Sequence, residues 1–177
     1  TFKTVQELKP SHYRSYVMRA TCLQKLCEDI PSLKEDSSFV LDIIDQYSAA
    51  IQILNNMLGK GYNNLATVKK SGTSENGGND NDDDDKTNAK ETLRDVLFER
   101  AMLCKELKYI PNTIPDLSEC VKLDNTFVKA YYHRALTFHY DMKKLNEAMA
   151  DYVHILTKLN PKHEEKVNAL YHKGHVD

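Results

Sequence analysis

Long apolar runs are missing from this 177-residue sequence. No stretch approaches the roughly 20 apolar residues that a membrane-spanning helix needs, so we expect no transmembrane segment in it. Basic runs are missing as well, and the formal net charge is −2. That balance gives no reason to expect a nucleic acid or an acidic membrane as the partner.

Cysteine is sparse, and the signatures of catalytic and metal sites are absent. The four cysteines form no Cys-x-x-Cys motif, and no Asn-x-Ser/Thr sequon occurs, so we expect a cytoplasmic protein whose Cys104 and Cys120 pack as apolar side chains. There is no glycine-rich phosphate loop and no nucleophile elbow. His172 and His175 have a spacing that suits a metal, but no third ligand is recognisable. We therefore expect neither an enzyme nor a bound cofactor or metal.

The dipeptide Arg-Ala, in contrast, occurs three times. It stands at Arg19-Ala20, Arg100-Ala101 and Arg134-Ala135, and the last two copies lie 34 residues apart. A second landmark, a leucine followed by helix-breaking residues, recurs at 8–10, 123–125 and 159–161. Two landmarks kept in phase at this period indicate a helical repeat.

The stretch from Asp116 to Ala135, DLSECVKLDNTFVKAYYHRA, resembles the tetratricopeptide repeat (TPR) family. In that family, large and small residues at fixed positions let paired helices approach closely. One repeat carries them at Leu97, Ala101, Cys104, Thr113 and Cys120. The next carries them at Tyr131, Ala135 and Phe138 and then drifts by one residue to Ala148 and Ile155. The resemblance implies an all-α, right-handed TPR-like solenoid of about three helix–turn–helix repeats plus terminal half-repeats.

Apolar periodicity predicts the helices. We expect the first at 12–26 and a second over 40–58, with a loop between them and about 18 residues inserted in this repeat. Pro115 is expected in the first turn of its helix. The remaining helices are predicted at 91–109, 113–123, 126–141, 144–159 and 164–175. No strand is predicted.

Three segments follow from this pattern. Residues 1–58 form a first repeat preceded by the tail of another helix, and residues 91–177 form two repeats and the start of a further one. Between them, residues 59–90 hold five of the six glycines and an acidic run from Asp82 to Asp85. We expect this low-complexity Asn/Asp/Gly-rich insertion to be disordered, from about Ser71 to Ala89, because it cannot bury enough apolar surface.

The resemblance also implies where a partner binds. First helices of TPR repeats line a concave groove, and apolar or aromatic side chains at groove positions suggest a bound protein segment. The predicted groove residues are Phe98, Glu99, Met102, Lys129, Tyr132, His133, Leu136, His139 and Tyr140. We therefore expect a non-catalytic scaffold that binds a peptide or helix.

Chaperone-binding TPR proteins grip a terminal carboxylate with a clamp of basic and amide side chains. The corresponding positions here are Val17, Thr21, Glu99, Lys129 and His133, and only Lys129 matches the family. Glu99 would repel a carboxylate, so this mode of binding is disfavoured. An alternative is the TPR part of a J-protein-like co-chaperone adaptor whose effector domain lies elsewhere. An enzyme ranks third.

Overall fold

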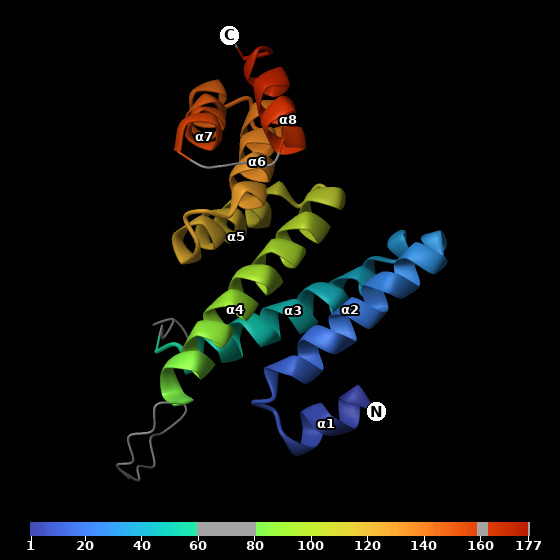
Figure 1. The fold of residues 1–177 in the computed structure, drawn as a ribbon. Helices are drawn as coiled ribbons and strands as arrows, with labels where there is room; N and C mark the ends of the chain where they lie inside the picture. The colour runs from blue at the N-terminus through green and yellow to red at the C-terminus, as the bar shows by residue number, and fades with distance from the viewer. Residues whose placement is uncertain (60–80, 159–162, 177) are drawn as a thin grey trace. The chain divides into compact units, whose positions relative to one another are not determined.

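The computed structural model describes residues 1–59, 81–158 and 163–176 (Figure 1). These residues are helical with short connections, and they contain no strand. The chain divides into an N-terminal unit, Thr1–Leu93, and a C-terminal unit, Arg94–Asp177. The all-α fold class expected from the sequence is confirmed at this level.

The N-terminal unit begins with α1 (Phe2–Leu8), α2 (Tyr13–Asp29), a 3-10 turn η1 (Pro31–Lys34) and α3 (Ser37–Met57). Asp36 caps α3, because its carboxylate accepts hydrogen bonds from the backbone of Ser38 and Phe39. These bonds lower the pKa of Asp36. Residues of α2 and α3 that recur at helical spacing form the core. They include Ala20, Ile43, Tyr47, Ala50 and Leu54, all essentially inaccessible to solvent.

A ring of polar side chains holds α1, which buries no residue of its own. Gln6 donates to Gln46 (2.9 Å), and Gln46 donates to Asp42 (2.9 Å). Arg19 closes the ring with bonds to Asp42 (2.8 Å) and Gln6 (3.3 Å). Polar contacts thus link α1 to both α2 and α3.

The C-terminal unit contains the later part of α4 (Asn81–Glu106), followed by four further helices and one π-helical turn. These are α5 (Ile110–Leu123), α6 (Val128–Leu136), the turn η2 (Thr137–Asp141), α7 (Leu145–Lys158) and α8 (His163–Lys173). Helix α6 packs against both α5 and α7, and α8 packs against α6 and α7 (Figure 1). Their core contains Tyr131, Ala135, Ala148, Tyr152, Ile155 and Ala169.

Each Arg-Ala dipeptide has the same structural role. The three alanines are fully buried, as close packing of paired helices requires. Each arginine reaches across to an aspartate of the following helix: Arg19 to Asp42, Arg100 to Asp116 and Arg134 to Asp151. The last two are bidentate, with both bonds 2.7–2.8 Å long. The repeat in the sequence is therefore a repeated helix pair in which the same Arg–Asp ion pair recurs.

These ion pairs also correct the expected length of the first insertion. Arg19 and Asp42 are 23 residues apart, against 16 for Arg100 and Asp116. The insertion is thus seven residues, not about 18. Because α2 continues to Asp29 and η1 turns the chain directly into α3, little of it is loop.

The one-residue drift in the third repeat has a structural cause. Arg134 and Asp151 are 17 residues apart, one more than the preceding pair. The extra residue is absorbed by the π-helical turn η2, in which Met142 N–H donates to the Thr137 carbonyl five residues back (3.0 Å).

Two expectations differ from the structure. Helix α4 begins at Asn81, so residues 81–89 are helical where disorder was expected, and Ala89 is buried. The acidic run falls in the first turns of α4, where the helix dipole favours negative charge. Residues 60–80 lie outside the described part of the chain.

Helix α5 begins at Ile110, so Pro111 and not Pro115 occupies its first turn, and Pro115 lies inside the helix.

Replacing Ala135 with leucine is expected to lower the free energy of unfolding by about 1–3 kcal/mol, because the larger side chain overpacks the contact between α6 and α7. Thermal unfolding followed by circular dichroism measures this. Ala150→Leu, at an exposed position of α7, is the matched control and should melt close to wild type. Equal melting temperatures for the Ala135→Leu variant and the wild type would contradict the assigned packing.

Candidate functional site

Helices α4, α6 and α8 bring a set of aromatic and imidazole rings together in the C-terminal unit. Phe98 of α4 contacts His133 of α6 edge-on, with ring centroids 5.6 Å apart. Tyr132 lies 5.5 Å from His133 and 5.9 Å from His172 of α8. We call Phe98, Tyr132, His133, His139, Tyr140, Tyr152 and His172 the ring cluster.

The π-helical turn supplies two members of the ring cluster. Within η2, His139 stacks on Tyr140 with a centroid distance of 4.1 Å and an interplanar angle of 18°. The hydroxyl of Tyr140 forms a 2.9 Å hydrogen bond with His172 Nδ1. The turn that follows α6 is therefore hydrogen-bonded to α8.

Tyr152 of α7 is the fully buried member of the ring cluster. Its ring is nearly parallel to that of His172 at 6.3 Å and meets His139 edge-on at the same distance. Among the described residues, Tyr152 Oη and His139 Nδ1 are buried atoms without a hydrogen-bond partner. Buried polar atoms without a hydrogen-bond partner are rare in folded proteins, and here two of them lie where Tyr152 and His139 meet.

Burial keeps the imidazoles of the ring cluster neutral near pH 7. It lowers the pKa of His133 to about 4, assisted by the positive charges of Lys105 and Lys129. Burial also lowers the pKa of His139 and of His172, with neighbouring histidines adding to the effect. The cluster therefore presents neutral rings rather than a set of cations.

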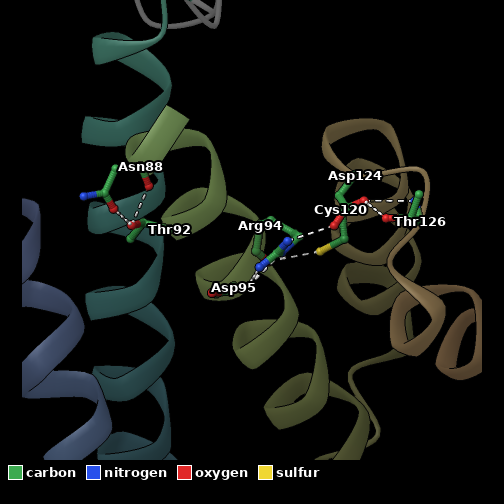
Figure 2. A network of polar contacts seen from close by, with 7 residues as sticks. All are labelled: Asn88, Thr92, Arg94, Asp95, Cys120, Asp124 and Thr126. Carbon is green, nitrogen blue, oxygen red and sulfur yellow. Dashed lines mark hydrogen bonds and ion pairs between the residues drawn. The ribbon is translucent and has the colours of Figure 1, made fainter. Parts of the chain in front are cut away.

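A polar network fixes the Phe98 end of the ring cluster (Figure 2). Arg94 donates a 2.8 Å hydrogen bond to Asp124, the residue that follows α5, and Asp124 also accepts hydrogen bonds from the backbone N–H and the hydroxyl of Thr126. The Arg94 guanidinium also lies 4.8 Å from the ring centre of Phe127, which contacts Phe98 edge-on at 5.2 Å. The connection between α5 and α6 is thus held against α4, with Phe127 packed on Phe98.

The other predicted groove residues lie on the same helices but outside the ring contacts. Met102 and Leu136 are half-buried, whereas Glu99 and Lys129 are exposed. Partial burial of its carboxyl group and the charge of Asp95 raise the pKa of Glu99, and Lys129 opposes this.

Two of the positions that correspond to the carboxylate clamp of the TPR family lie in the N-terminal unit. Val17 and Thr21 belong to α2 of the N-terminal unit, where the Thr21 hydroxyl donates to the Val17 carbonyl. The Thr21 hydroxyl and the Val17 carbonyl are thus hydrogen-bonded to each other within α2.

Sequence reasoning missed Tyr152 and His172 as members of the site. The spacing of His172 from His175 suggested only a metal ligand. The signal that could have found it is the similarity of Tyr132-His133-Arg134 to Tyr171-His172-Lys173, which places His172 at the position of His133. Tyr152 follows the ion-paired Asp151 directly, but this pairing was not anticipated.

The described residues include histidine, cysteine, aspartate and glutamate side chains, the usual protein ligands of metal ions. They contain no group of three or more His, Cys, Asp or Glu side chains arranged to hold a metal ion. Of the cysteines, Cys104 and Cys120 are buried as expected, and burial raises the pKa of both thiols, that of Cys120 to about 12. No helix in the described part of the chain is long and apolar enough to cross a membrane.

Neither a protein-family model nor a curated protein matches this chain.

Proposed function

We propose that the chain is a TPR-like interaction module whose C-terminal unit binds a peptide or helix of a partner protein over the ring cluster. The proposal depends on one observation: rings from α4, α6 and η2 meet those of α8 in one continuous set of contacts. Phe98, Tyr132 and His133 are half-buried, and Tyr140 is 45% exposed. Partly exposed aromatic residues with fixed neighbours are typical anchors at protein interfaces.

Electrostatics favours an internal peptide segment over a terminal carboxylate. The imidazole of His133 is neutral near pH 7, so it does not supply the positive charge that a carboxylate clamp needs. Glu99 adds negative charge beside Lys129. Contacts to rings and to the amides of a peptide backbone are therefore expected to contribute more to binding than ion pairs.

Tyr132→Ala is expected to weaken partner binding by about 2 kcal/mol or more, roughly 30-fold, because truncating a central aromatic anchor removes most of its contact area. Lys129→Ala should weaken it less. The measurement is quantitative affinity capture from lysate with the wild type and both variants, followed by titration of the captured partner. Tyr109→Ala, a tyrosine exposed at the start of α5, is the control and should bind as the wild type does.

A second titration separates this proposal from the carboxylate clamp. Chaperone C-terminal peptides are added with a free carboxylate and with a terminal amide. Micromolar binding that disappears on amidation and with Lys129→Ala would overturn the proposal.

A further inference from the structure

Lys105 lies on the face of α4 that contributes to the ring cluster. Phe98, Met102 and Lys105 are spaced by four and then three residues, so their side chains project from the same side of the helix. Burial is the main cause of the lowered pKa values of His133 and His172, and the positive charge of Lys105 contributes to both. The ammonium of Lys105 therefore lies close to rings of both α6 and α8.

The positive charge of Lys105 is half-buried and only weakly compensated. Burial lowers the pKa of its ammonium, and the carboxylate of Asp141 only partly opposes this effect. Asp141 is exposed at the end of η2, where water screens its charge. Among the described residues, then, Lys105 forms no ion pair, and the free energy lost by dehydrating its charge is not recovered.

Other basic side chains of the C-terminal unit differ from Lys105 in this respect. Arg100 and Arg134 are each held by two hydrogen bonds to an aspartate of the following helix. Lys129 is exposed, and its charge acts on the carboxylate of Glu99. The contrast indicates that Lys105 gains more than these side chains from an added negative charge.

A segment bound over the ring cluster would change the surroundings of Lys105. Because Lys105 shares its helix face with Phe98 and Met102, such a segment would also displace water from the ammonium. A buried charge without a counter-charge is unfavourable, whereas a carboxylate beside it would restore the lost stabilisation. Part of the dehydration has already taken place in the unbound protein, so this ion pair would lose less solvation on forming than a pair of fully hydrated side chains.

We propose that the partner segment carries an internal aspartate or glutamate whose carboxylate pairs with Lys105. The inference rests on the proposed function, because it assumes that the segment binds over the ring cluster, and it adds the chemistry by which segments are distinguished. Contacts to the rings hold the segment, and the carboxylate selects it. A segment with a neutral or basic side chain at this point would bury an uncompensated positive charge, which disfavours it.

Random segments displayed on phage between fixed flanking sequences test this preference on the full chain. The wild type should select segments with an aspartate or glutamate at a constant spacing from an aromatic or apolar residue. Lys105→Met should lose that acidic position, and Lys105→Gln should behave in the same way. Lys90→Met is the matched control, because it replaces an exposed lysine of α4, and it should select as the wild type does.

Titration of one selected segment measures the size of the effect. Replacing its acidic residue with the corresponding amide should weaken binding to the wild type by about tenfold. The same replacement should have little effect on binding to Lys105→Met. Circular dichroism should show that Lys105→Met keeps its fold, since the substitution removes a partly dehydrated charge and leaves an apolar stem of similar length.

Three outcomes would contradict the inference. Segments that need Tyr132 but show no acidic position, or the same acidic preference in Lys105→Met, would overturn it and leave the proposed function standing. Selection of no segment whose binding is lost in Tyr132→Ala would contradict the proposed function and this inference with it. A dimer of the wild-type chain in sedimentation that Lys105→Met dissociates would also overturn it, because the carboxylate would then come from a second copy.

Discussion

Replacing Arg134 with methionine is expected to lower the free energy of unfolding by about 3–5 kcal/mol, more than the overpacking at Ala135 should cost. The Arg134 side chain is 17% exposed and that of Asp151 is 8% exposed. Both carboxylate oxygens of Asp151 accept from the guanidinium, so methionine would leave a buried negative charge without its main partner. Urea unfolding followed by circular dichroism measures the loss.

Two variants show whether burial is the cause. Arg19→Met removes the corresponding pair of the N-terminal unit, whose side chains are 27% and 36% exposed, and should cost about 1 kcal/mol or less. The double variant Arg134→Met/Asp151→Leu should recover most of the stability that Arg134→Met loses, because it also removes the buried Asp151 carboxylate that would lack its arginine. Equal losses for Arg19→Met and Arg134→Met would show that burial does not set the size of the effect.

Acidification from pH 6.5 to 4 is expected to destabilise the C-terminal unit, with His133 contributing about 3 kcal/mol at most. The pKa of His133 is about 4 in the fold and about 6.5 in the unfolded chain. Within this window the unfolded chain binds the proton and the folded chain does not, so stability falls as the pH falls. Above the unfolded pKa the contribution of His133 is constant, and below about pH 4 its loss is complete.

The comparison of wild type with His133→Gln isolates this contribution. His139 and His172 act in the same direction, because their pKa values are also lowered by burial. Glu99 acts in the opposite direction, because its pKa is raised. Only the slope of stability against pH is compared, since the substitution also removes the contact with Phe98. Parallel slopes for the two proteins would show that His133 is not protonated preferentially in the unfolded state.

The spacing of apolar residues predicted the helices of the C-terminal unit well, because apolar residues that recur every three or four positions lie on the buried face of a helix. The burial of Ala101 and Ala135 followed instead from the family resemblance, which places small residues where paired helices approach closely. Disorder was expected from about Ser71 to Ala89, and the structure differs from this at 81–89, which belong to α4. Composition takes no account of position, and acidic residues favour the start of a helix. The expected length of the first insertion was wrong because apolar positions alone allow several alignments of this repeat with the others. The Arg19–Asp42 ion pair selects one of them, since it corresponds to the Arg–Asp pairs of the later repeats.

Several of the predicted groove residues lie close together in the structure. Phe98, Tyr132, His133, His139 and Tyr140 belong to one cluster, because α4 meets α6 at the Phe98–His133 contact and η2 continues α6. The geometry at Tyr140 could not be foreseen, since it depends on a π-helical turn that an apolar pattern does not encode. Tyr152 was missed because a fully buried tyrosine on a second helix resembles an ordinary core residue.

The Arg–Asp pairs have a consequence for how the protein folds. Each pair joins residues only 16, 17 or 23 positions apart, so its two helices can meet after the closure of a short segment. Closing so short a segment costs little chain entropy, and proteins dominated by such local contacts fold in microseconds to milliseconds. During synthesis each helix pair can therefore assemble as soon as its second helix has left the ribosome, before the next pair has been made.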